Sequence, residues 1–180
     1  MKSSAAVSAK PAPDEYAPYY GTYVSLVPDA DIVATLEKQL HETTALLTSH
    51  SEADGEFRYA PGKWSVKEVL GHLVDTERVF AYRAMRIARN DKTPLAGFEQ
   101  DDYVKNGSFA ERSLASLIQE FASVRNATLS LFRGLEEAAW VRRGVANKNE
   151  VTVRAIAYIT AGHELHHRKI LREKYFPAQG

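Results

Sequence analysis

Four long amphipathic stretches dominate the 180-residue sequence and restrict it to a helical fold. In each of them, apolar residues recur every three or four positions, which places them along one face of an α-helix. The spacing predicts helices over residues 29–50, 65–89, 113–134 and 152–175. Because no stretch shows a strand pattern, we expect an all-α protein built as a four-helix bundle, without β-strands.

Local signals mark several helix ends and connections. Ser65 and Glu68 have the spacing of a capping box, and Thr152 is a plausible cap for the last helix. A short helical piece is expected near Trp140, followed by a polar loop. The connection over residues 90–110 is long for a compact domain, so the second and third helices need not be antiparallel neighbours. Connections of this length usually cross a bundle or carry function.

Residues 1–28 differ in composition from the predicted bundle, which covers residues 29–176. They begin as a tail rich in Ala, Ser and Pro, which we expect to be partly disordered, and then become rich in tyrosine. This aromatic content is too high for a purely disordered segment. We expect an arm packed on the outside of the domain; a lid over a pocket or a dimer contact is the alternative. The tyrosines are Tyr16, Tyr19, Tyr20 and Tyr23.

Charge and composition exclude several classes of partner. Basic and acidic residues number 23 each, so the chain lacks the basic field that nucleic-acid binding normally requires. No apolar run approaches the roughly 18 residues of a membrane span, and the N-terminus lacks the apolar region of a signal peptide. We therefore expect a cytoplasmic protein that binds neither nucleic acid nor membrane. Since there is no cysteine, any metal must be held by His, Asp or Glu.

The segment 162–168, GHELHHR, contains the H-E-x-x-H pattern of zinc proteases. On a helical wheel, His163 and His167 lie about 40° apart on the core-facing side, whereas His166 lies at its edge. Two inward imidazoles need partners, and a divalent metal would satisfy both, although ordinary buried histidines are the alternative. In a zinc protease of this kind, Glu164 would act as the general base, and a third zinc ligand would lie downstream of the two histidines. Only thirteen residues follow His167 and none suits that role, so the third ligand must lie upstream.

His72 is the candidate for that third ligand. It lies in the middle of the second predicted helix, on the flank of the apolar stripe, where it can reach a pocket. Together with His163 and His167 it would supply the three ligands of an open, catalytic metal site. Imidazole suits zinc, nickel, iron and copper alike. His41 and His50 are surrounded by Thr and Ser and are expected at the surface.

An arginine on the core side of the third helix is a second functional candidate. Arg125 falls within the apolar stripe, and a buried arginine needs an anionic partner. We expect a structural ion pair with Asp75 or Glu77, with binding of a substrate carboxylate as the alternative. Asp75 could instead orient a ligand histidine.

Three further polar residues are candidates for the site. Thr76 and Arg83 share a helix face with His72 and could bind substrate, although a surface position is the simpler expectation for Arg83. Glu164 could act as the base in a hydrolytic reaction. A solvated helix charge is the simpler interpretation of Glu164.

Three motifs in this order resemble the DinB/YfiT-like superfamily: GKWSVKEVLGHLVDTE, PLAGFEQDDYV and HELHHRKIL. The likeness covers residues 29–175 and implies a four-helix bundle of up-down-down-up topology, often a homodimer. It also implies a divalent metal, for which zinc or nickel is expected, held by His72, His163 and His167. Characterised relatives include metal-dependent transferases that use low-molecular-weight thiols as cosubstrates.

The resemblance therefore implies a thiol-dependent S-transferase that acts on a small electrophilic molecule. A metal bound to the thiol would lower its pKa and present a nucleophile, so that the protein would need no cysteine of its own. Two alternatives remain open. One is a hydrolase that uses metal-activated water, and the other is a non-catalytic, stress-related binding module whose metal is structural or lost.

Overall fold

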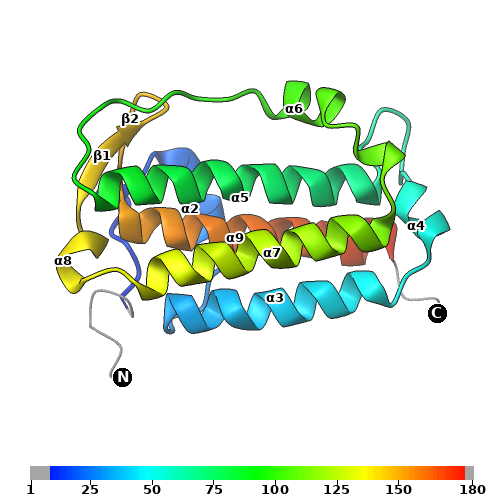
Figure 1. Ribbon diagram of the computed structural model, residues 1–180, viewed down its shortest axis with the longest axis horizontal. Helices are drawn as coiled ribbons and strands as arrows, with labels where there is room; N and C mark the ends of the chain where they lie inside the picture. Colours follow the sequence, from blue (N-terminus) through cyan, green and yellow to red (C-terminus); the bar gives the residue numbers. More distant parts are fainter. Residues whose placement is uncertain (1–8, 177–180) are drawn as a thin grey trace.

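The computed structural model describes residues 9–176, and its main body is a bundle of four long helices. Helices α5 and α7 run in the opposite direction to α3 and α9, which gives an up-down-down-up topology (Figure 1). Helix α5 packs against α7 and α9, and α3 packs against the same two helices. The expected bundle is thus confirmed. The four helices are α3 (Ile32–Thr48), α5 (Val66–Ala88), α7 (Leu114–Arg133) and α9 (Val153–Ile170).

Each long helix begins at a polar cap. The Asp31 carboxylate accepts hydrogen bonds from two backbone amides of α3, and the Ser113 hydroxyl accepts one from the Ser116 amide of α7. Ser65 and Glu68 form the expected capping box of α5, and Thr152 caps α9. These side chains satisfy amides that would otherwise lack partners, and the predicted starts at 65, 113 and 152 coincide with them. The first helix begins later than its predicted start at residue 29, because its cap is Asp31. The last predicted helix continues from α9 into a π-helical turn, Leu171–Tyr175.

The connection between α5 and α7 runs back along the length of the bundle (Figure 1), which is why these two helices are parallel. It contains a short helix, α6 (Gln100–Asn106), and a 3-10 turn, η3 (Phe109–Glu111), neither of which the sequence predicted. Phe109 is buried and lies directly over Gly71 of α5, where an added Cβ would be 2.4 Å from the ring. The connection is therefore packed onto the bundle rather than looped into solvent.

The expectation that the chain has no strands is wrong. After the expected short helix α8 (Glu137–Trp140), strands β1 (Arg143–Ala146) and β2 (Asn149–Thr152) form an antiparallel hairpin that pairs Ala146 with Asn149. The two turn residues, Asn147 and Lys148, have φ values of 48° and 66°, as in the tight turns that suit a hairpin. Four-residue strands are too short to show a convincing alternation in sequence.

The described part of the N-terminal arm lies along α9. It consists of η1 (Pro13–Glu15), η2 (Pro18–Tyr20) and α2 (Gly21–Val24). At Gly162 of α9, a Cβ atom would be 2.1 Å from the carbonyl oxygen of Tyr23, so the two backbones approach as closely as only glycine allows. The Glu15 carboxylate accepts a 2.7 Å hydrogen bond from Thr152 and pairs with Arg154. Residues 1–8, where a disordered tail was expected, lie outside the described residues. No helix in the described range is long and apolar enough to span a membrane.

A buried guanidinium joins all four long helices. Arg125 of α7 is fully buried, and its Nε and Nη2 atoms donate 2.8 Å hydrogen bonds to the Glu77 carboxylate of α5. Nη2 also lies 2.6 Å from Oε2 of Glu164 in α9, while Nη1 donates to the carbonyl oxygen of Leu36 in α3 at 3.0 Å. Thr43 of α3 donates to the other oxygen of Glu164. The structure thus shows the ion pair with Glu77 that was one of the two expectations for Arg125.

Replacement of Arg125 should destabilise the bundle strongly. Arg125→Met removes the cation and leaves the carboxylates of Glu77 and Glu164 buried without a counter-charge, for which we expect a loss of about 3–5 kcal/mol in the free energy of unfolding. Urea denaturation followed by circular dichroism measures this loss.

The matched control is Arg133→Met on the same helix, where the ion pair with Glu37 is about half exposed on both sides. We expect that substitution to cost less than about 1 kcal/mol. Equal losses in the two variants would show that the buried cluster does not hold the bundle together.

Candidate metal centre

Three histidines from two helices converge in the interior of the bundle. His72 comes from α5, whereas His163 and His167 lie one turn apart on α9, and one ring nitrogen from each falls within 4.8 Å of the others. The Nε2 atoms of His72 and His163 are 3.0 Å apart. The helix wheel placed His163 and His167 on an inward face and His72 on the flank of its apolar stripe, and the packing of α5 against α9 brings the three together.

Burial keeps these imidazoles neutral. It lowers the pKa of His72 to about 4 and that of His167 to about 3, the latter with a smaller contribution from the nearby His72 and His166 rings. The pKa of His163 also falls well below its ordinary value, first because of burial and then because of the neighbouring histidines. At neutral pH all three rings therefore offer an unprotonated nitrogen, which is the form that binds metal.

The donor set fits a divalent metal. In a direct hydrogen bond between His72 and His163, one ring would donate to the other, so that only one lone pair of the three-histidine cluster would be used. A cation bound between the three rings would accept all three lone pairs at once. Three imidazoles are also the protein ligands of open catalytic zinc sites, which keep a further position for water or substrate.

The surroundings of the cluster differ in part from the sequence-based expectation. The Oγ1 atom of Thr76 lies 3.4 Å from Nδ1 of His72, so Thr76 contacts the site. The Asp75 carboxylate, considered as an orienting group, lies 3.4 Å from Arg78 instead. His166 lies beside Tyr23, with ring centroids 5.4 Å apart, and is not part of the cluster.

Glu164 and Arg125 do not line the cavity beside the histidines. Glu164 is neither a solvated charge nor a free base, because its carboxylate is buried against Arg125 and Thr43. Arg125 is likewise fully buried against Glu77, Glu164 and the Leu36 carbonyl, away from the cavity wall, so it is not placed to bind a substrate carboxylate. The helix wheel showed that Arg125 is buried, but it could not show which helix supplies its partners.

A cavity of about 240 Å³ opens onto the cluster. His72 and His163 form part of its wall, together with Thr76, Phe80 and Arg83 of α5. The remaining wall comes from three segments that are far apart in the sequence: the N-terminal arm, the long connection and the hairpin turn. From these segments the lining residues are Tyr19, Tyr20, Tyr23, Phe98, Glu99, Gln100 and Asn147.

The tyrosines of the arm thus contribute to the wall of the cavity. Tyr23 packs edge-on against His163 with ring centroids 5.4 Å apart, and its hydroxyl lies 3.2 Å from that of Tyr19. Burial raises the pKa of both Tyr20 and Tyr23, which keeps their hydroxyls protonated at neutral pH. Their clustering in sequence was visible, but nothing in the sequence indicated which helix they would cover.

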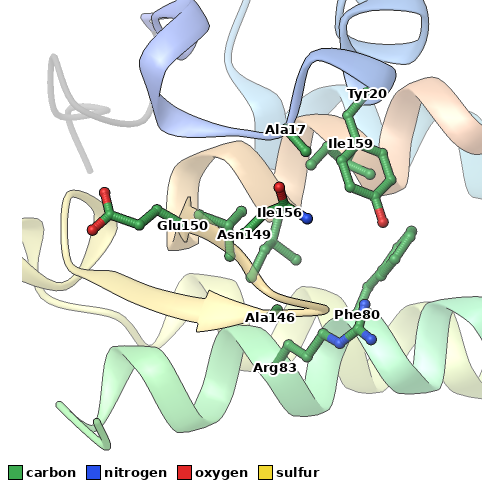
Figure 2. Close-up of a pocket in the computed structure, with 10 residues that line it drawn as sticks. Ala17, Tyr20, Phe80, Arg83, Ala146, Asn149, Glu150, Ile156 and Ile159 are labelled. Carbon is green, nitrogen blue, oxygen red and sulfur yellow. The ribbon is translucent and has the colours of Figure 1, made fainter. Parts of the chain in front are cut away.

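A second, smaller pocket of about 20 Å³ shares Tyr20, Phe80 and Arg83 with the histidine cavity (Figure 2). Its other walls are mostly apolar and include Ile156 and Ile159 of α9. The three shared side chains lie side by side at one end of this pocket in Figure 2. The simpler expectation of a surface position for Arg83 is therefore wrong, because its side chain is buried at the junction of two cavities.

A family model described as the DinB superfamily matches residues 35–171, which include all three histidines. This chain belongs to the DinB superfamily. Among solved structures, this DinB protein resembles YfiT from Bacillus subtilis, with a TM-score of 0.66 and 14% sequence identity over 92% of this chain and 93% of YfiT. YfiT is described as a probable metal-dependent hydrolase with an unusual four-helix bundle topology. No curated protein matches this chain.

Metal content tests the ligand set of this DinB protein. After loading with Zn²⁺ or Ni²⁺ and removal of excess metal, we expect about one metal ion per chain, as the single three-ligand cluster among the described residues implies. His72→Ala, His163→Ala and His167→Ala should each lose most of it, since each removes one of three ligands. Elemental analysis of the folded variants measures the effect. His166→Ala is the matched control and should retain its metal; a similar loss in that variant would argue against the assigned set.

The metal-free protein should lose stability as the pH falls from 6.5 to about 4. The unfolded chain takes up a proton on His72 below its ordinary pKa of 6.5, whereas the folded protein resists this until about 4. Protonation therefore favours unfolding within this interval. His72→Gln lacks this group, so between pH 7 and pH 4.5 it should lose about 2 kcal/mol less than the unchanged protein. Urea denaturation at the two pH values measures the difference, and parallel losses would contradict the prediction.

Proposed function

We propose that this protein is a metal-dependent enzyme that transfers a small thiol to an electrophilic molecule. The observation that carries the proposal is the chemistry of the cavity: two of the three clustered imidazoles, those of His72 and His163, lie in its wall, and no buried carboxylate accompanies them among the described lining residues. Glu99, the carboxylate in that wall, is exposed, and Glu164 is held by Arg125. The cavity thus offers metal ligands without a buried general base.

This arrangement favours a nucleophile that ionises easily. A divalent metal held by these imidazoles supplies Lewis acidity and lowers the pKa of a thiol or water bound to it. A thiol starts from a pKa of about 8.5, whereas water starts from about 15.7, so a thiol needs far less assistance to ionise at neutral pH. The absence of cysteine means that the thiol must come from a cosubstrate.

The residues around the histidines would bind and orient the reactants. Tyr20 and Tyr23 present protonated hydroxyls that can donate hydrogen bonds to the acceptor or to its leaving group. Phe80, whose ring centroid lies 6.0 Å from that of His163, shields one side of the reacting centre. In the reaction, the thiol loses its proton to solvent and its sulfur forms a new bond to carbon. The leaving group departs with the electron pair of the bond that breaks.

Hydrolysis is the second candidate. It is favoured by the likeness of the fold to YfiT, which is described as a probable metal-dependent hydrolase. In that reaction water would take the place of the thiol. The hydrolytic role considered for Glu164 has no support in the structure, because its carboxylate lies in the buried cluster with Arg125.

A thiol panel distinguishes these reactions. The Zn²⁺- or Ni²⁺-loaded protein is incubated with low-molecular-weight thiols and a chromogenic electrophile, and the absorbance change is followed. We expect turnover that requires both the thiol and the metal, and a decrease of at least about 100-fold in His163→Ala, which loses one of the three ligands. His166→Ala should keep its activity.

Each other result would overturn the proposal in a defined way. Ester or amide cleavage that proceeds without thiol would identify the hydrolase. A metal-loaded, folded protein that is inactive in both assays would indicate a binding module with a structural metal.

A further inference from the structure

Arg83 carries a buried positive charge that no carboxylate in the described part of the chain neutralises. Its side chain is only 5% exposed, and it forms no ion pair with Asp or Glu. The other two arginines on the same stretch of α5 are paired: Arg78 lies 2.6 Å from Glu120, and Arg86 contacts Asp91. A buried charge without a counter-charge is costly, so Arg83 requires an explanation that its neighbours do not.

The contacts that Arg83 does make are neutral. Its Nη2 atom donates a 2.6 Å hydrogen bond to the Ala96 carbonyl oxygen, and its guanidinium carbon lies 5.8 Å from the centre of the Phe98 ring. The Tyr20 hydroxyl is close enough to interact with it electrostatically. These contacts hold the guanidinium in place and leave its charge uncompensated. Consistent with this, burial lowers the pKa of Arg83.

Arg83 lies in the same cavity as the metal ligands and on the same face of α5. It follows His72 by eleven positions, which corresponds to about three helical turns and places the two side chains about 20° apart around the helix axis. The corresponding distance along the axis is roughly 16 Å. Thr76 and Phe80 lie between them, and all four side chains line the cavity. The cavity therefore has a cluster of neutral metal ligands at one position and a fixed cation at another.

An outer groove offers a different location for an anion. Arg83 also borders a groove of about 490 Å³ together with Arg78 and Arg86. Those two guanidiniums are already engaged by carboxylates, and they are at least partly exposed. By contrast, the Tyr20 side chain that faces the Arg83 guanidinium lines the histidine cavity and not the groove. The histidine cavity is therefore the better location for an anion held by Arg83.

We propose that Arg83 binds the carboxylate of a small, elongated ligand whose sulfur lies at the histidine cluster. The planar guanidinium matches a carboxylate, and the charge-assisted contact would supply the missing counter-charge. The position of the sulfur rests on the proposed thiol-transfer function, whereas the carboxylate site rests on Arg83 alone. The ligand class is thus a thiol that carries a carboxylate several bonds away from its sulfur.

Binding of matched thiols to the metal-loaded protein tests this assignment without an activity assay. We compare ω-mercaptocarboxylates of increasing chain length with mercaptoalcohols of the same length by isothermal titration calorimetry. In Co²⁺-loaded protein, the thiolate absorption band reports sulfur coordination separately. At one or more chain lengths, the carboxylate should bind about tenfold or more tightly than the alcohol, as expected for a charge-assisted contact.

Three variants locate the contact. In Arg83→Gln, the carboxylate and the alcohol should bind equally, whereas Arg83→Lys should keep part of the preference because it retains the charge. Arg86→Gln is the matched control, since Arg86 lies one turn further along α5 and borders only the outer groove. It should leave the preference unchanged. Metal content and thermal unfolding confirm that the variants are folded, and if Arg83→Gln is not, Arg83→Lys and the unchanged protein still provide the comparison.

The remaining outcomes separate the two proposals. Equal binding of acids and alcohols to the unchanged protein, with the thiolate band present, overturns the carboxylate site and leaves thiol binding intact. A preference that disappears in Arg86→Gln places the anion in the outer groove and also overturns it. Tighter binding of a mercaptophosphonate would replace the carboxylate assignment. If no thiolate band forms, the proposed thiol transfer is wrong. The anion site can still be tested in that case, because titration of simple alkyl carboxylates against the unchanged protein and Arg83→Gln decides whether Arg83 binds an anion.

Discussion

The buried ion cluster around Arg125 is the contact on which the rest of the structure depends. Its guanidinium lies on α7 and binds a carboxylate of α5, a carboxylate of α9 and a backbone carbonyl of α3. Glu77 follows His72 by little more than one helical turn, and Glu164 is adjacent to His163. The same contacts that hold the bundle together therefore also set the distance between the two helices that carry the histidines. Fold stability and site geometry have a common origin in this protein.

The four helices could be predicted from sequence because their evidence is local. The apolar periodicity and the caps at Ser65 and Thr152 depend only on residues within the same helix. The inward positions of His163 and His167 follow from the same periodicity. The proximity of these two histidines to His72 could only be inferred from the sequence, because it depends on how α5 packs against α9.

The features that were missed depend on contacts distant in sequence. The Glu164 carboxylate is next to a metal ligand in the chain, yet its role is decided by Arg125, which lies on another helix. The hairpin has strands of only four residues, and it is supported by backbone hydrogen bonds between Leu95 and residues of the hairpin. No periodicity within 143–152 could reveal that support.

The walls of the histidine cavity come from two parts of the chain with different relations to the family. The three histidines and Arg83 fall within the 35–171 region that matches the DinB superfamily, whereas Tyr19, Tyr20 and Tyr23 precede it. The three histidines thus lie within the region that the family model matches, whereas part of the wall beside them comes from residues that precede this region. A substitution among these tyrosines would therefore change the shape of the space beside the histidines without changing the histidines themselves.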